Sequence, residues 1–409
     1  MGAASPTRRR LFTSDLSAAL SIANSSTTTK TRKASDTYFE LWTQFCADLG
    51  HEPSLSSLPD QEARLGYLLV FGLRYRQTGQ TGKPVRADSV DKALLAVGQG
   101  FTHLGQPDPR KLPGQDKFHP VFDAFLRGLR KEDAPASRVY PCNITIIQQL
   151  QAVLDTSHHM YGRLNAHAID LIIVAFFWLL RPAEYLDTST PGARSQAFCF
   201  RDIYLTIDGK VYCAPDAPLN DPTSLERLTQ SALRFGDQKN AVRGETVGHA
   251  TTSDPFFCPS KALFRLARHL HQHDASPDTP IFRHYNSHFN SWYSVKPSHI
   301  TNSIRHAAGS IEDTTGIPPS LLSARSLRPG GATALLCANV DKDAIALLGR
   351  WKSDAMLRYL RIQAHTHSAN FAQRMWEAGA YTFAPGASLP GQVPPGLAQV
   401  LQHHELYTD

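Results

Sequence analysis

The chain has 409 residues, a hydrophobic fraction of 42% and a formal net charge of +6 at pH 7, with a pI near 9.0. This length allows two or more domains with real hydrophobic cores, and the basic balance permits a polyanionic partner. Six scattered cysteines without a C-x-x-C pair argue against a disulfide scaffold or a zinc ribbon and indicate free thiols in a reducing compartment.

The apolar segments indicate no membrane insertion. The longest apolar run, Leu171 to Leu180, is ten residues, which is too short to span a bilayer. No apolar run near the N-terminus resembles a signal peptide. We therefore expect a soluble intracellular protein without a membrane partner.

The N-terminal third predicts a basic tail followed by a helical domain. Residues 1–34 are rich in Ser, Thr and Ala and include Arg8-Arg9-Arg10, which predicts a disordered tail. The basic cluster serves nuclear import or DNA contact, or is simply solvated. Apolar residues at helical spacing predict helices over 35–49, 60–76, 88–104 and from 120 onward. Together these helices predict a domain over 35–131, and the exposed side of the last one carries Arg127, Arg130 and Lys131.

Residues 132–141 are polar and contain two prolines, so we interpret them as a linker to a second domain over 142–380. That domain opens with predicted helices over 144–154 and 167–180. The second of these is apolar nearly all round and therefore buried. It runs into Arg181-Pro182-Ala183-Glu184, where the arginine either serves the helix dipole or belongs to a functional R-x-x-E box.

Strand signals follow in the middle of this domain. Residues 200–207 and 210–214 flank Asp208-Gly209, which predicts a type I′ hairpin turn. A second pair, 232–235 and 246–250, brackets a turn that contains Lys239, with Arg243 nearby. We expect one small antiparallel sheet in an otherwise helical domain.

The next segments are helical again, over 259–271 and 299–309. The first ends in His269, His271 and His273, which suggest a metal cluster. Their alternation does not suit one helix face and no carboxylate or cysteine completes a ligand set, so we expect a solvated helix end and no metal. Residues 381–409 are rich in proline and glycine and predict a loose tail.

The segment from Ser323 to Arg361 contains three short helices with a regular spacing of functional side chains. Arg328 follows Ser326-Leu327 at a helix start, and Gly330 and Gly331 leave room for close backbone approach. A second helix over 341–348 is expected to end at Gly349. Tyr359 follows ten residues after that glycine, on a third helix.

This segment resembles the C-terminal signature of the tyrosine recombinases, the phage-integrase family. In that family an H-x-L-R box precedes a helix of small residues, L-G-H or L-G-W, and a nucleophilic tyrosine ten residues after the glycine. The version here is similar to recombinases of certain eukaryotic mobile elements. Two positions depart from the pattern: Arg325 stands where the box histidine is expected, and Arg350 replaces the second His or Trp, with Trp351 one place later.

The resemblance implies a mainly α protein with a helical DNA-clamping domain and an α-rich catalytic domain that contains a small antiparallel sheet. It implies site-specific cleavage and rejoining of double-stranded DNA through a covalent 3′-phosphotyrosine intermediate, without metal, ATP or another cofactor. The catalytic residues implied are Arg181, Lys239, Arg325, Arg328, Arg350 and Tyr359, with Glu184, Trp351 and His249 as secondary candidates. Arg127, Arg130 and Lys131 would contact DNA.

Alternative functions stay open at this point. Since an arginine cannot accept the proton of Tyr359, the chain is either an active recombinase, with His249 or His365 as a substitute base, or a recombinase-derived protein that binds DNA without cutting it. A type IB topoisomerase uses the same kind of constellation. An active recombinase would self-associate on DNA, and in a eukaryote it would act in the nucleus.

Overall fold

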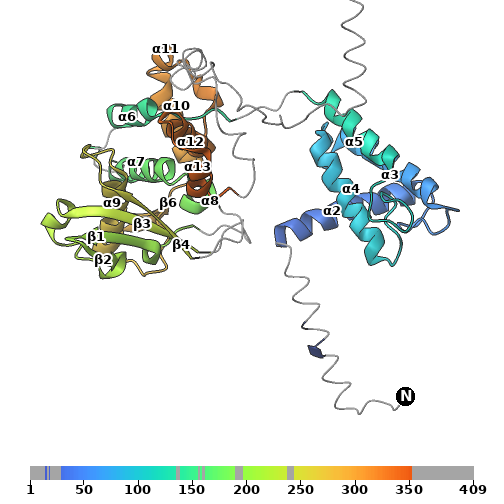
Figure 1. Ribbon diagram of the computed structural model, residues 1–409, viewed down its shortest axis with the longest axis horizontal. Coiled ribbons are helices and arrows are strands. Elements are labelled where there is room, and N and C mark those ends of the chain that lie inside the picture. The colour runs from blue at the N-terminus through green and yellow to red at the C-terminus, as the bar shows by residue number, and fades with distance from the viewer. Residues whose placement is uncertain are drawn as a thin grey trace, which may run out of the picture.

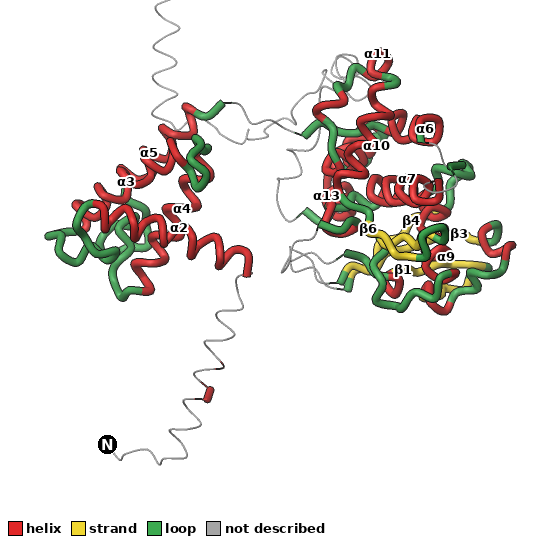
Figure 2. Tube along the Cα trace, turned by 180° about the vertical axis from the view of Figure 1, so that it is seen from behind, coloured by secondary structure: helices red, strands yellow, loops and turns green. Residues whose placement is uncertain are grey.

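The computed structural model describes residues 14–15, 18, 29–134, 139–154, 157–158, 162–188, 197–236 and 244–351 (Figures 1 and 2). These residues form a mainly α structure with a small antiparallel sheet, which confirms the predicted fold class. Several residues to which the sequence assigned roles lie outside the described residues: Arg8, Arg9, Arg10, Lys239, Arg243, Tyr359 and His365. The tail predicted over 381–409 lies outside them as well. No described helix combines the length and apolarity needed to cross a membrane.

The N-terminal helices are α2 (Thr29–Asp48), α3 (Gln61–Thr78), α4 (Ala87–His103) and α5 (Pro120–Glu132). Helix α2 begins upstream of residue 35, so the helix extends into the segment predicted as a tail. Asp60 caps α3 by accepting the amide of Ala63 at 2.7 Å, and Pro120 opens α5 at a position where its missing N–H costs nothing. Trp42 is completely buried in the core that these helices share.

The outer side of α5 carries the three predicted DNA contacts. Arg127 and Lys131 are exposed. Arg130 is also exposed but donates to Asp91 at 2.7 Å, so part of its charge is already compensated within the protein. The DNA contacts assigned to this helix stay a prediction.

The second group of elements spans residues 144–349. Its helices are α6 (Ile144–Val153), α7 (Gly162–Phe177), α8 (Pro182–Tyr185), α9 (Pro259–Gln272), α10 (Pro297–Gly309), α11 (Glu312–Thr315), α12 (Leu327–Cys337) and α13 (Lys342–Gly349). Its strands are β1 (Ile203–Ile207), β2 (Lys210–Cys213), β3 (Leu228–Phe235), β4 (Glu245–Ala250), β5 (Arg283–Asn286) and β6 (Ser291–Ser294). Short 3₁₀ segments lie at Phe200–Asp202, Ala214–Asp216, Pro222–Leu225, Pro319–Leu321 and Ala324–Ser326.

Helix α7 is the centre of this group, as its apolar sequence predicted. Its residues from His167 to Phe176 are all buried, and α9 packs against both α7 and the sheet. Asp170 of α7 accepts from Arg265 of α9 at 3.0 Å, which fixes the two helices to each other. Burial raises the pKa of Asp170 to about 6 although Arg265 opposes the shift.

The sheet has strand order β2-β1-β3-β4 and is antiparallel throughout. The φ angles of 51° at Asp208 and 75° at Gly209 confirm the predicted hairpin turn between β1 and β2. The expectation of one sheet was wrong, because β5 and β6 form a second, two-stranded sheet. These four-residue strands contain many polar side chains, so no apolar alternation marked them, and β5 is held by packing on α7 and α9.

Candidate functional site

The turn that follows α7 organises the candidate site. The predicted helix to Leu180 ends earlier, at Phe177, and Leu179 has a left-handed φ of 51°. The carbonyl oxygen of Trp178 accepts from Arg350 at 3.2 Å, and that of Leu179 accepts from both Arg328 and Arg350. These two carbonyls belong to the turn just after the last helical residue, and the two guanidinium groups that donate to them stabilise this turn.

Glu184, buried with 1% of its surface exposed, joins two arginines. Its carboxylate accepts from the Arg181 guanidinium and from the Arg181 backbone amide, both at 2.8 Å, and from the Arg350 guanidinium at 3.3 Å. The R-x-x-E spacing places the carboxylate three residues after Arg181, within the single turn of α8. A carboxylate that is already paired with two cations is a poor metal ligand and a good anchor for the arginines.

Arg328 lies at the start of α12 and is only 4% exposed. Its guanidinium donates to the carbonyl oxygens of Leu179 and Gly349, and its central carbon lies 4.3 Å from the centre of the Trp351 ring. Bonds from two directions and a stacked ring together fix the plane of this guanidinium.

The glycines after Arg328 are required by close packing, as the sequence predicted. A Cβ atom at Gly330 would lie 1.9 Å from the carbonyl oxygen of Cys142, and one at Gly331 would lie 2.2 Å from that of Phe176. Because backbone atoms cannot easily move aside, glycine at these positions lets α12 approach Cys142 and the end of α7 this closely. This approach brings Arg328 to the turn that follows α7.

Gly349 does not end α13 in the way we expected. It is the last helical residue, and Arg350 takes the left-handed conformation, with φ of 56°. Glycine is needed at 349 for another reason: a Cβ atom there would lie 1.7 Å from the Trp351 ring. The unfavourable φ of Arg350 is offset by its bonds to the carbonyl oxygen of Trp178 and to Glu184.

Arg350 is buried against the sheet as well. Its guanidinium carbon lies 3.9 Å from the centre of the Phe235 ring, at the end of β3. Burial lowers the pKa of Arg350 to about 10, and Arg181 adds to this shift, while Glu184 and Glu245 oppose it. The guanidinium therefore stays charged at neutral pH.

His249 of β4 lies beside the same turn. Its Nε2 contacts the carbonyl oxygen of Phe177 at 3.1 Å, and its ring packs edge-on against Trp178 with centroids 4.5 Å apart. Since a carbonyl only accepts, Nε2 carries the proton and the lone pair is on Nδ1. Burial lowers the pKa of His249, so the ring is neutral at pH 7.

The structure thus brings together six predicted residues: Arg181, Glu184, His249, Arg328, Arg350 and Trp351. It does not join Arg325 to them by any described contact; this side chain is exposed, and its backbone amide donates to the Ser323 hydroxyl at 3.3 Å. Lys239 and Tyr359 lie outside the described residues. The catalytic roles assigned to all these residues stay predictions.

Sequence reasoning missed the parts of the site that act through backbone or packing. The carbonyl groups of Trp178 and Leu179 carry no side-chain signal, and Phe235 was recognised only as a strand residue. Phe235 immediately precedes the loop that contains Lys239, and this proximity in sequence was the one available clue.

No protein-family model and no curated protein matches this sequence. Among solved structures, the chain is similar to the Tn1549 transposon integrase in complex with transposon right end DNA. The identity is 11% over 77% of this chain and 85% of that chain, with a TM-score of 0.42. A structure of the same integrase in complex with circular intermediate DNA gives 11% identity over 76% of this chain and 84% of that chain, with a TM-score of 0.39.

Proposed function

We propose that this protein is a DNA recombinase that cleaves and rejoins strands through a covalent phosphotyrosine, with Tyr359 as the nucleophile. The observation that carries the proposal is the meeting of two distant motifs. Glu184, which holds Arg181, also accepts from Arg350, 166 residues later in the chain. The Leu179 carbonyl oxygen accepts from both Arg350 and Arg328, and Arg328 lies 149 residues after Leu179. Tyr359 follows Trp351 by eight residues in the sequence.

The chemistry explains why arginines are suited to such a site. A phosphodiester carries negative oxygens, and attack on phosphorus is helped by fixed cations that stabilise the charge of the transition state. A guanidinium is always charged and can bind two phosphate oxygens at once. Orientation of Arg328 by two carbonyls and Trp351 would preorganise it for this task.

Two further residues complete the proposed reaction. The Tyr359 oxygen would attack phosphorus and store the energy of the broken bond in a phosphoester, so that a strand hydroxyl can later reseal it. Lys239 would give a proton to the leaving 5′ oxygen. The segment that contains Lys239 follows Phe235 in the sequence, and the contact of the Phe235 ring with Arg350 supports this role for Lys239.

The burial of Arg350 favours a second candidate, a DNA-binding protein that does not cut. Arg350 occupies the position of a histidine or tryptophan in the family pattern, yet it is 4% exposed and bonded to Glu184 and to carbonyls. It holds the site together rather than supplying a base. Arg325, in place of the first histidine, cannot accept a proton either. The imidazole of His249, which packs edge-on against Trp178, would offer the lone pair on its Nδ1 as the base.

Covalent trapping separates these two candidates. The full chain is incubated with nicked duplex DNA whose cleaved strand loses a short fragment, so that religation is prevented, and adducts are resolved on a denaturing gel. We expect an adduct with the wild type and none with Tyr359→Phe, which keeps the ring and removes only the hydroxyl. The matched control is Tyr293→Phe, at a tyrosine that is 41% exposed, and it should react like the wild type.

The outcomes assign function as follows. Adduct formation by Tyr359→Phe would show that the nucleophile lies elsewhere. Tight DNA binding without any wild-type adduct would support the non-cutting candidate. Relaxation of supercoiled plasmid in place of exchange between two duplexes would identify a topoisomerase. Strand exchange would require self-association, which sedimentation of the protein on DNA would detect.

A further inference from the structure

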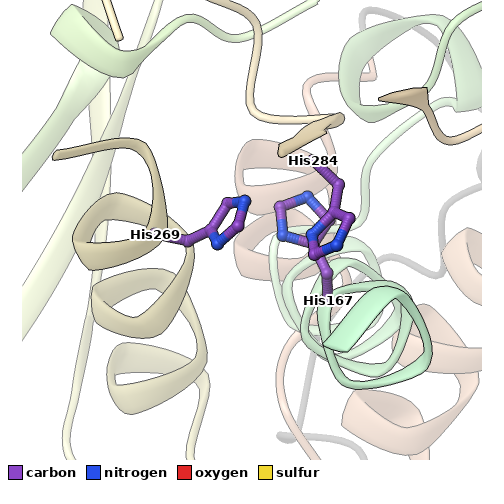
Figure 3. A group of neighbouring side chains, drawn as sticks. All are labelled: His167, His269 and His284. Carbon is purple, nitrogen blue, oxygen red and sulfur yellow. The ribbon is translucent and has the colours of Figure 1, made fainter. Parts of the chain in front are cut away.

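Three histidines from separate elements meet on the side of α7 that faces α9 and β5. His167 belongs to α7, His269 to α9 and His284 to β5, and Figure 3 shows their rings close together. One nitrogen from each residue lies within 4.8 Å of the nitrogens of the other two. The expectation of a solvated helix end was wrong for His269, because its ring packs on His284 at a centroid distance of 4.5 Å.

His284 is the member that plain packing does not explain. It is 1% exposed, and neither Nδ1 nor Nε2 has a hydrogen-bond partner among the described residues. Buried polar atoms in folded proteins almost always have a partner, and leaving one without a partner is costly. An orphan imidazole that packs against two other imidazoles, at centroid distances of 4.5 and 5.2 Å, therefore points to a ligand that accepts nitrogen lone pairs.

The tautomer of His167 already suits such a ligand. Its Nε2 lies 3.0 Å from the carbonyl oxygen of Ile281, which can only accept, so Nε2 carries the proton and Nδ1 carries the lone pair. A hydrogen bond from the second ring nitrogen to a carbonyl is how metal-bound histidines are commonly oriented.

The protonation states of the three histidines also suit a bound metal. Burial, together with the neighbouring imidazoles, holds the pKa of His167 well below its usual range. Burial is also the main cause that lowers the pKa of His269 to about 3 and that of His284 to about 4. All three rings are neutral near pH 7, which is the form that binds metals.

We infer that His167, His269 and His284 form a zinc site that fastens α7 to α9 and β5. Neutral imidazole nitrogens are typical ligands of Zn²⁺, with Zn–N distances of about 2.0–2.1 Å. Two nitrogens on one tetrahedral ion lie roughly 3.4 Å apart, so the observed arrangement needs only a modest contraction through side-chain rotation. The fourth coordination position would be occupied by water or by His273, which follows His269 by four residues and whose ring centre lies 4.9 Å from that of His269.

His269 is the ligand that has to rearrange. Its Nε2 accepts the backbone amide of Tyr285 at 2.9 Å, so the proton is on Nδ1. Zinc would exchange this amide bond for a metal bond. We therefore expect replacement of His167 or His284, whose lone pairs need no such exchange, to weaken zinc binding at least as much as replacement of His269.

The test uses the full chain without a polyhistidine tag. Metal-free protein is equilibrated with Zn²⁺ and freed of excess, and bound zinc is measured together with the midpoint of thermal unfolding. We expect about one zinc per chain and a higher midpoint, because a ligand bound only by the folded state stabilises it. Co²⁺ should give the visible absorption of a tetrahedral nitrogen site.

Two variants and a control make the result decisive. His284→Leu should lose the zinc and the zinc-induced rise while its metal-free midpoint stays equal or increases, since the orphan nitrogens are gone. His167→Gln, whose amide can still donate to Ile281, should also lose the zinc. His306→Gln, at an exposed histidine of α10, should bind like the wild type. Equal zinc binding by wild type and His284→Leu, or none by the wild type, would overturn the inference. The assay contains no DNA, so its outcome is independent of the proposed function.

Discussion

Replacement of Glu184 with glutamine tests the arginine network directly. Glu184→Gln keeps the shape of the side chain but removes the charge that holds Arg181 and Arg350. It also replaces one carboxylate oxygen by an NH₂ group. Both carboxylate oxygens accept hydrogen bonds in the structure, at 2.8 Å from Arg181 and 3.3 Å from Arg350, so the new NH₂ group must face a donor.

The expected cost follows from burial. Glu184 is 1% exposed, and the Arg350 side chain is fully buried with 0% exposure. Removing one partner of a buried ion pair destabilises a protein by about 3–5 kcal/mol, because the remaining charge stays in a poorly solvating environment. Glutamine keeps one acceptor, and Arg181 is 22% exposed and partly solvated, so we expect the lower end, about 3 kcal/mol. For a domain of this size that lowers the unfolding midpoint by about 6–12 °C.

The assay is thermal and urea unfolding of the full chain, followed by far-ultraviolet circular dichroism. Glu226→Gln, at an exposed glutamate beside β3, is the matched control and should change the midpoint by less than about 1–2 °C. A Glu184→Gln midpoint equal to that of the control would refute the reasoning, because it would show that Arg350 does not depend on this carboxylate.

Three further outcomes are expected. Gly331→Ala should destabilise the chain by about 2–3 kcal/mol, because its Cβ atom would lie 2.2 Å from the carbonyl oxygen of Phe176. Gly309→Ala is the control and should not destabilise it, because the nearest neighbour of its Cβ atom would lie 3.8 Å away. Urea unfolding of the two variants measures the difference. The pKa values of His269 (about 3) and His284 (about 4) lie below the unfolded value of 6.5, so the folded, zinc-free protein binds fewer protons in this window. The free energy of unfolding, measured by urea titration, should therefore decrease as the pH falls from 6.5 to 4, by up to about 1.4 kcal/mol per pH unit for each group, and a constant value would contradict this. DNA affinity should decrease steeply with salt through counterion release, and a flat response in fluorescence anisotropy titrations would argue against a DNA-tracking surface.

Much of the local structure could be predicted because the chain repeats simple apolar patterns. The helical periodicity of residues 60–76, 88–104 and 259–271 predicted α3, α4 and α9 to within a few residues. The Asp208-Gly209 pair predicted its turn because few other residues tolerate positive φ at both positions. The two-stranded sheet of β5 and β6 was not predictable in this way, since its short polar strands are stabilised by contacts with distant helices.

The sequence by itself determined which arginines and glycines to examine. Arg181, Glu184 and Arg328 were selected because their motifs resemble the boxes of the tyrosine recombinases and follow the same order, and Gly330 and Gly331 were selected as positions of close backbone approach. It could not show that Arg350 holds Glu184, or that the carbonyl oxygens of Trp178 and Leu179 receive the guanidinium groups. Backbone carbonyls are identical along the chain, and only the fold decides which of them are left without helical partners.

The histidine cluster was decided entirely by tertiary structure. In the sequence, His269 belongs with His271 and His273, and their spacing argued against a ligand set made from one helix. The fold instead brings His269 to His167, which lies 102 positions earlier in the chain, and to His284, which lies 15 positions later, through the packing of α9 and β5 on α7. Long-range contacts of this kind depend on how helices and strands pack, and no local pattern of residues encodes them.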